Sequence, residues 1–252
     1  MMMYIRRIVL IFNQNFKLMK HTFILLAALV LFAGIQLHAQ ALKECSVSSF
    51  DEVKFEGSAT WILIPSNEEK VLVESKSEDV FEYVDVDVKG NVLSINTTDK
   101  QKNITKLFKS VTIKVFFKSI ISVSLSGTGS VNTDKRFSAS TLTATLSGSG
   151  NMYLDVDCEV FRGNMYGTGL LNAKGTADKS IVRVDGVGGF DGYDFITNSM
   201  DVTVSGVGGA KVHATNKLTA TLNGVGSIRY KGDPETKNLN TNGVGAIKEA
   251  KD

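Results

Sequence analysis

The sequence predicts an all-β protein whose C-terminal half is a parallel β-solenoid, a β-helix with coils of about 19 residues. The first observation behind this prediction is a glycine pair that recurs at nearly constant intervals. The second is the alternation of apolar and polar side chains around each pair, which is typical of strands with one buried face. The third is a composition with 43% hydrophobic residues, 23 Gly and only 2 Pro, which supplies a core and argues against disorder.

Residues 1–41 are predicted to be a signal peptide that directs export. A short basic start at Met19–His21 precedes an apolar run from Thr22 to Ile35, and small residues over Leu37–Ala41 offer a cleavage site. The apolar run has about 14 residues where a membrane span needs roughly 20, so a transmembrane anchor is the less favoured alternative. In an alternative interpretation, translation starts at Met19, which suits a signal peptide better than Met1, and residues 1–18 are not translated.

Removal of this leader would change the charge of the chain. Every charge within residues 1–40 is positive: Arg6, Arg7, Lys17 and Lys20. Without these four, 24 of the 28 basic residues remain against 26 acidic ones, so the net charge falls from +2 to near −2. A nucleic-acid partner is therefore not expected, since such binding needs a basic face that displaces counterions.

Few reactive side chains remain after the leader. Cys45 and Cys158 would reach a compartment where a disulfide is permitted, and they either pair or stay free. Of the three histidines only His213 remains, which disfavours histidine metal sites and most histidine-dependent catalysis. No catalytic residue, metal ligand or cofactor is predicted.

The stretch 42–118 is predicted to be a β-rich but irregular N-terminal portion of the domain. A hairpin is expected over Val84–Ile95, with an alternating strand, a turn at its glycine and a return strand. The polar stretch Asn96–Lys109 is expected to form a connecting loop. Trp61 lies in an apolar run and is expected in the core.

Residues 119–252 form the predicted repeat array, with seven glycine pairs. The first glycines advance by 21, 19, 19, 20, 18 and 19 residues. The pairs are Gly127 and Gly129, Gly148 and Gly150, Gly167 and Gly169, Gly186 and Gly188, Gly206 and Gly208, Gly224 and Gly226, and Gly243 and Gly245. We expect them at a corner of each coil, where they supply positive φ or allow close approach of the backbone. A phosphate-binding loop is excluded, since none of the pairs is followed by the helix that such a loop requires.

Two apolar columns flank the glycine pairs and should line the core. One column comprises Leu125, Leu146, Met165, Val184, Val204 and Leu222, and the other Val131, Met152, Leu171, Phe190, Ala210, Ile228 and Ile247. Thr241 breaks the first column. The residues on either side of the first column are mostly Ser, Thr and Asn, which predicts polar ladders on the outer surface. Coils stacked about 4.8 Å apart would form a rod roughly 30 Å long.

The repeats and two flanking motifs carry a family resemblance. Phe50–Val53 at the start, the serial S-G-S-G-like coils and the late Tyr230–Pro234 motif resemble the head GIN domain family of auto-transporter adhesins, exported by Bacteroidetes-type bacteria. The resemblance covers residues 50–248 and implies a right-handed parallel β-solenoid with an adhesin-like role. In four coils the residue between the glycines is Val, which makes the corner more apolar and weakens the case for a Ser/Thr binding corner.

These features predict a non-catalytic binding module of the cell envelope, located in the periplasm, on the outer surface or secreted. Its partner would be a glycan or a surface protein, and the mature chain would have no transmembrane span. The alternatives are a structural envelope spacer without a dedicated ligand and, less favoured, a β-helix enzyme that cleaves polysaccharides. The acids available to such an enzyme do not recur at a spacing that demands a shared metal: Asp155, Asp157, Asp185, Asp191, Asp194 and Asp201.

One departure from the polar ladders suggests a contact patch. Tyr166, Arg183 and Asp185 should be neighbours on two successive coils. The alternative interpretation is an ordinary surface pair of Arg and Asp beside a tyrosine, which contributes little energy.

Overall fold

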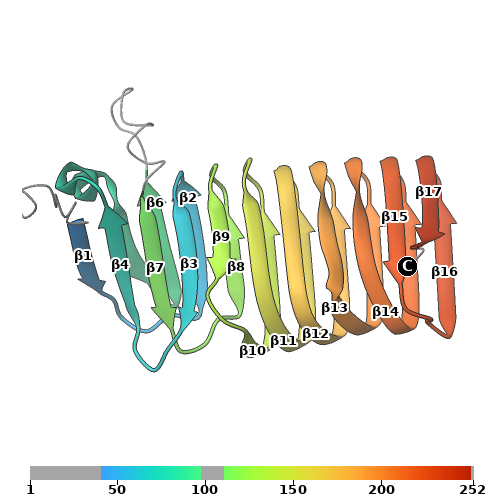
Figure 1. Cartoon of the computed structure of the whole chain (residues 1–252), viewed down its shortest axis with the longest axis horizontal. Helices are drawn as coiled ribbons and strands as arrows, with labels where there is room; N and C mark the ends of the chain where they lie inside the picture. Colours follow the sequence, from blue (N-terminus) through green and yellow to red (C-terminus); the bar gives the residue numbers. More distant parts are fainter. Residues whose placement is uncertain (1–40, 98–110, 251–252) are drawn as a thin grey trace, which may run out of the picture. The chain divides into compact units, whose positions relative to one another are not determined.

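The computed structural model describes residues 41–97 and 111–250, which form a stack of flattened coils (Figure 1). All but the last residue of the predicted signal peptide, and most of the predicted loop Asn96–Lys109, fall outside this description. Hydrogen bonds connect every strand of the described chain into one 17-stranded sheet that closes around the core. The prediction of an all-β parallel solenoid with an irregular N-terminal part is confirmed.

The strands and the single short 3₁₀ helix follow one another along the chain. They are β1 (Ala41–Ser46), β2 (Glu52–Gly57), β3 (Thr60–Pro65), β4 (Lys70–Ser75), η1 (Glu78–Tyr83), β5 (Asp85–Lys89), β6 (Val92–Thr97), β7 (Thr112–Phe117), β8 (Ser122–Leu125), β9 (Ser130–Thr133), β10 (Phe137–Leu146), β11 (Asn151–Met165), β12 (Thr168–Val184), β13 (Val187–Val204), β14 (Val207–Leu222), β15 (Val225–Lys231), β16 (Thr236–Thr241) and β17 (Val244–Glu249).

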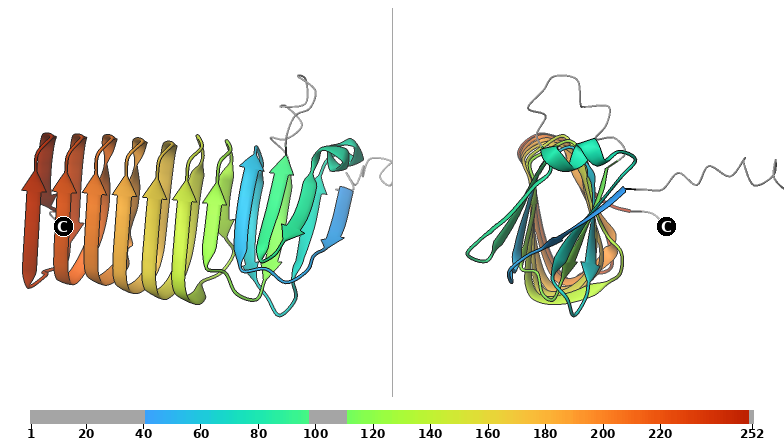
Figure 2. Two further views of the ribbon diagram at one scale, coloured as in Figure 1. Left: turned by 180° about the vertical axis from the view of Figure 1, so that it is seen from behind. Right: turned by 90° about the vertical axis from the view of Figure 1, so that its left-hand side faces the viewer.

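Each coil contributes to two sheet faces (Figure 2). The two faces meet at the glycine pairs. The first face contains β6, β2 and β8, then the C-terminal parts of β10 to β14, and finally β16. The second face contains β7, β3 and β9, then the N-terminal parts of β11 to β14, and finally β15 and β17. All these neighbours are parallel. The long strands β11 to β14 bend from the second face into the first.

The two predicted apolar columns line the space between the faces. Except at the ends of the stack, their side chains are almost fully buried, from Leu125 and Val131 to Leu222 and Ile228, which are all 0% exposed. Alternate residues point outward because successive side chains of a strand lie on opposite faces. The prediction that both columns form the core is therefore confirmed.

The glycine pairs lie in vertical register at one edge of the stack. Gly188 is level with Gly208, Gly226 and Gly245, and the peptide N–H of Val187 donates to the carbonyl oxygen of Gly167 at 2.9 Å. A Cβ on Gly148 would collide with the carbonyl oxygen of Gly127. Gly188 has φ +145°, a conformation that L-residues rarely adopt. The first glycine of a pair thus provides close approach, and the second provides positive φ in five of the seven corners.

The N-terminal coils do not stack in the order of the chain. The coil made by β2 and β3 lies between the β6–β7 coil and the β8–β9 coil (Figure 1). Phe55 is level with Leu125 and Trp61 with Val131, so the segment Phe55–Trp61 is an eighth, degenerate corner. Sequence reasoning missed it because Ala59 replaces the second glycine. The repeat architecture therefore begins before residue 119.

Antiparallel strands close the N-terminal end of the stack. β1 pairs with β4, which pairs with β7 on the second face, and β5 pairs with β6 on the first face. The pair β5–β6 is the hairpin expected over Val84–Ile95, so that prediction is confirmed. Trp61 is 0% exposed and packs in the core as predicted.

The two cysteines are free in the structure. Cys45 in β1 is five strand steps from β11, which carries Cys158, a separation of about 24 Å along the stack. A disulfide needs Cα atoms within about 7 Å of each other. The alternative of a bridge within the chain is therefore wrong. In the described residues, no helix has the length and apolarity to cross a membrane.

Candidate functional site

The candidate catalytic acids do not converge in the structure. Arg136 pairs with Asp155 at 2.6 Å and with Asp157 at 3.7 Å, and Lys211 pairs with Asp191 at 2.9 Å. Within residues 41–97 and 111–250, no three side chains of His, Cys, Asp or Glu gather as a metal site would require. Of the six candidate acids, Asp155, Asp157 and Asp191 thus belong to surface ion pairs.

The predicted contact patch of Tyr166, Arg183 and Asp185 has the expected placement. Tyr166 and Asp185 follow the paired residues Met165 and Val184 on adjacent coils, and Tyr166 is 53% exposed. Arg183 and Asp185 are both exposed, and no ion pair joins them in the described part of the chain. The three residues are therefore neighbours, and their role in binding remains a prediction.

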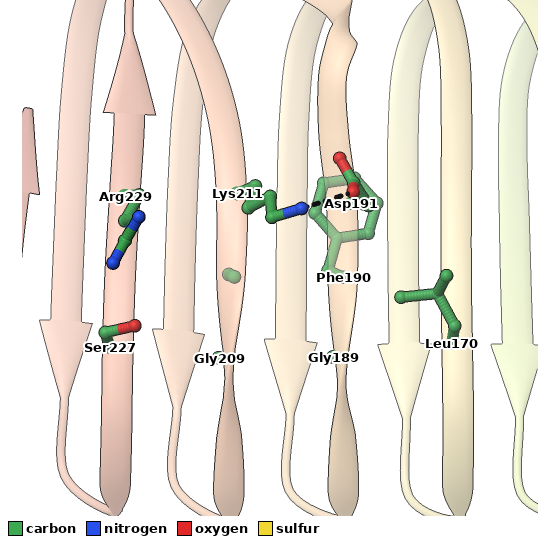
Figure 3. Close-up of a pocket in the computed structure, with 9 residues that line it drawn as sticks. Leu170, Gly189, Phe190, Asp191, Gly209, Lys211, Ser227 and Arg229 are labelled. Atoms are coloured by element: carbon green, nitrogen blue, oxygen red, sulfur yellow. Dashed lines mark hydrogen bonds and ion pairs between the residues drawn. The ribbon is translucent and has the colours of Figure 1, made fainter. Parts of the chain in front are cut away.

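A shallow trough on the second face is the most distinctive hollow of the C-terminal coils. It has a volume of about 320 Å³ and is lined by Leu170, Gly189, Phe190, Asp191, Gly209, Ala210, Lys211, Ser227 and Arg229 (Figure 3). Its floor is the row of outward positions Gly189, Gly209 and Ser227, which are in register on three coils. Because two of them lack a side chain, the peptide backbone itself is the floor. Leu170 closes the trough towards the N-terminal coils.

Charged side chains form one rim of the trough. Asp191, Lys211, Arg229 and Lys248 occupy a single register position on four successive coils. The Lys211 ammonium reaches across to Asp191 at 2.9 Å (Figure 3), and the hydrogen bond with Asp191 raises the pKa of Lys211. Arg229 and Lys248 have no ion-pair partner among the described residues. We call Lys211, Arg229 and Lys248 the basic row.

Exposed valines lie beside the trough at the glycine corner, although none of them lines it. Val187, Val207, Val225 and Val244 are in register, lie two residues before the floor positions, and are 50–70% exposed. We call these four residues the valine ridge. A stripe of exposed branched side chains differs from the scattered apolar residues of an ordinary surface and indicates a contact role.

A bulge in β13 distorts the second face beside the trough. The register between β13 and β14 shifts between Asp191 and Ile196. The bulge brings the ring of Tyr193 within 5.5 Å of the Lys211 ammonium and 5.0 Å of the Lys231 ammonium. Bulges of this kind are over-represented next to functional sites, where they redirect side chains.

Sequence reasoning noticed the valines but not the trough. The floor lies three residues after the first glycine of each pair, and the basic row lies five residues after it. Aligning the repeats in columns at these two offsets would have shown both rows. The positions next to the first apolar column point instead to Tyr166, Arg183 and Asp185.

The sequence was compared with known families and structures. A family model described as "Putative auto-transporter adhesin, head GIN domain" matches residues 49–234, which is most of the chain. The chain belongs to this family. The resemblance inferred from the glycine corners and the Tyr230–Pro234 motif is thereby confirmed. A search of curated proteins with this head GIN sequence found no match.

Solved structures share the head GIN fold over most of their length. A "putative adhesin" from Bacteroides fragilis is 24% identical, with 84% of this chain and 97% of that chain covered at a TM-score of 0.77. A "Putative lipid binding protein" from Parabacteroides distasonis is 24% identical, with 84% and 97% covered at a TM-score of 0.65. A "putative adhesin" from Parabacteroides merdae is 19% identical, with 84% and 96% covered at a TM-score of 0.60. At these identities the similarity shows the fold alone.

Proposed function

We propose that this head GIN protein is an exported, non-catalytic module of the cell envelope that binds an external glycan or surface protein through the trough. The observation that carries the proposal is the parallel course of three different rows across the same coils: the valine ridge, the backbone floor and the basic row. Such an arrangement offers apolar contact, hydrogen-bonding main chain and charge to a ligand along the stack. Solenoids commonly bind partners on long repetitive faces of this kind.

The family and the relatives support a binding or adhesin-like role in general terms. Two of the three solved relatives are named as adhesins and one as a lipid-binding protein. None of these names describes an enzyme. The pairing of Asp155, Asp157 and Asp191 with basic side chains also favours binding over catalysis, because a general acid or base must face its substrate.

A lipid ligand is the second candidate, and the valine ridge is the observation that favours it. An acyl chain is normally enclosed in a pocket that buries most of its surface. The floor of this trough is outward-facing backbone on a sheet surface, and the ridge valines are at least half exposed. These features support an extended, partly hydrated ligand better than a buried lipid tail.

The proposal can be tested with the purified protein on arrays of glycans and extracellular matrix proteins. Two double variants compare the two candidate surfaces: Lys211→Ala with Arg229→Ala in the trough, and Tyr166→Ala with Arg183→Ala in the contact patch. We expect the trough variant to lose at least tenfold in affinity for the ligand that the arrays identify, and the patch variant to keep it. Binding lost only in the patch variant would move the site to Tyr166, Arg183 and Asp185. Absence of any ligand on the arrays would favour the envelope spacer.

The location is tested separately by protease treatment of intact cells. An adhesin-like module must be accessible from outside, so we expect external protease to degrade it. Full protection, with cleavage only after the cells are opened, would contradict the adhesin-like role and favour a periplasmic spacer.

A further inference from the structure

We infer that the trough takes a linear anionic polysaccharide that lies parallel to the stack, with its carboxylate or sulfate groups on the basic row. This inference rests on the proposed binding function and names the chemical class of the partner.

The spacing of the basic row matches a polymer with a regularly repeated charge. Lys211, Arg229 and Lys248 come from three successive coils in register. Neighbouring strands are about 4.8 Å apart, so the row presents one cation at about that interval. An extended chain of pyranose rings places one ring in about this rise, and a uronic-acid polymer carries one carboxylate on each ring. One ring per coil therefore brings a charged ring beside each basic residue, and every ring whose carboxylate faces the row can pair with it.

The charge of the row is available to a ligand. Asp191 pairs with Lys211 at one end, whereas Arg229 and Lys248 have no ion-pair partner in the described part of the chain. The whole sequence is nearly balanced, with 28 basic and 26 acidic residues, so the row is not a consequence of a basic composition. An arginine can form two parallel hydrogen bonds to a carboxylate or sulfate, which makes Arg229 the residue on which we expect the largest effect.

The shape of the trough suits a flat ring. The floor at Gly189 and Gly209 lets a ligand approach the backbone, and the valine ridge offers its methyl groups to the C–H face of a sugar. On the preceding coil the corresponding floor position carries Leu170, whose side chain closes the trough. The ligand should therefore lie along the C-terminal coils and end near Leu170.

Two other polyanions fit less well. An anionic membrane is a plane, and its headgroups would meet the projecting valine ridge before the recessed floor. Single-stranded nucleic acid normally needs aromatic side chains on which bases stack. Tyr193, the aromatic residue beside the trough, has the ammonium groups of Lys211 and Lys231 near its ring. Both polyanions are therefore competitors in the test.

The test is calorimetric titration of the purified protein with polygalacturonate and with its methyl ester, which has the same backbone without the charge. We expect polygalacturonate to bind, the ester to bind at least tenfold more weakly, and the affinity to fall as salt is raised. Arg229→Gln should weaken binding of polygalacturonate about tenfold or more. Arg162→Gln, an exposed arginine on the first face, is the matched control and should bind as the parent does. Ser227→Tyr should fill the floor and weaken both polymers.

The outcomes separate this inference from the proposed function. Equal binding of acid and ester would overturn the inference and leave a glycan-binding module in place. Equal competition by anionic vesicles or by single-stranded DNA would also overturn it, because the basic row would then be unselective. Failure of both polymers to bind, while the arrays identify a protein ligand, would reject the polysaccharide and keep the binding function. Unchanged binding by Arg229→Gln would contradict the assignment of the basic row.

Discussion

The N-terminal and C-terminal parts of the stack have the same cross-section but different chain paths. In the array, neighbouring coils are consecutive in sequence, so Leu170 donates its peptide N–H to Asn151, which is 19 residues earlier. In the N-terminal part, the hydroxyl of Ser58 donates to the carbonyl oxygen of Thr128, which is 70 residues later. The shape of a coil therefore depends on its apolar columns and its corner, and chain order is free to vary.

The two parts also differ in what fills the core. The N-terminal coils use large aromatic groups, such as Phe55 and Trp61, whose rings stack at 5.2 Å. The array relies more on aliphatic residues and small corners. Both parts bury a polar group without a hydrogen-bond partner, Trp61 Nε1 in the N-terminal part and Ser180 Oγ in the array. Trp61 also packs against the corner of the next coil, where a Cβ on Gly129 would collide with its ring.

The largest expected effect on stability concerns the interleaved coil, which is the coil of β2 and β3 that lies between the β6–β7 coil and the β8–β9 coil. Trp61→Ala removes a side chain that is 0% exposed and packs between two coils, and it should lower the free energy of unfolding by about 3–5 kcal/mol. Urea denaturation followed by circular dichroism measures this loss. Tyr166→Ala, on an exposed array position, should change it by about 0.5 kcal/mol or less. A loss below 1 kcal/mol for Trp61→Ala would mean that the β2–β3 coil is not integral to the stack.

The cysteine of the array should be much less reactive than an unfolded thiol. Burial, followed by the charges of Asp157 and Asp178, raises the pKa of Cys158 from 9.0 to about 12. At pH 8 the reactive thiolate is then scarcer by a factor on the order of 10²–10³, and alkylation should slow accordingly. Mass spectrometry of iodoacetamide-treated protein measures the rate at Cys158. The same residue in urea-unfolded protein is the control, and equal rates in the two states would show that the thiol is not protected.

The glycine corners of the array should tolerate no side chain. In Gly206→Ala the new methyl group would collide with the carbonyl oxygen of Gly186, and we expect a loss of about 2–4 kcal/mol. Ser205→Ala, one residue earlier and exposed, is the matched control and should be close to neutral. Thermal and urea denaturation of both variants give the comparison. Similar stabilities of the two variants would show that neighbouring corners can move apart without a loss in the free energy of unfolding.

The smallest expected effect is a gain in stability. Ser180 is 0% exposed, occupies a column with Phe161 and Met200, and its hydroxyl has no hydrogen-bond partner. Ser180→Ala should raise the free energy of unfolding by about 1 kcal/mol, because an unsatisfied polar group leaves the core. Ser199→Ala, on the outward side of the adjacent strand β13 and one residue before Met200, serves as the control. A destabilised Ser180→Ala would indicate that the hydroxyl has a partner, such as a buried water.

The sequence predicts most of the array but not the stacking order. Apolar columns from Leu125 to Ile228 and the seven glycine pairs are local signals, and period-two alternation assigns each side chain to the core or the surface. The pairing of Phe55 with Leu125 cannot be predicted from the sequence repeat. The segment from Phe55 to Ala59 has the shape of a corner but lacks the glycine pair. Only spatial pairing shows that Phe55–Trp61 belongs with the repeats.

The candidate site was only partly predictable. The positions of Tyr166, Arg183 and Asp185 follow from the repeat length, and the structure places them together. The trough depends on what is missing at Gly189 and Gly209, and on the alignment of Lys211, Arg229 and Lys248 across coils. A hollow made by absent side chains becomes visible only when rows of several coils are compared side by side.

The interleaved coil has a consequence for how the protein acquires its structure. β2 and β3 are synthesised before both of their neighbouring coils, and one of these neighbours, β8 with β9, is synthesised much later. The β2–β3 coil therefore cannot complete its pairing until β8 and β9 have been made. Closing a loop of 70 residues instead of 19 adds only about 1 kcal/mol of chain entropy, but contacts of such long range slow folding. Once β8 and β9 have paired with β2 and β3, every later coil can pair with the exposed strand edges of the coil before it through local contacts. The N-terminal part is thus expected to be the slow nucleus and the array the fast extension.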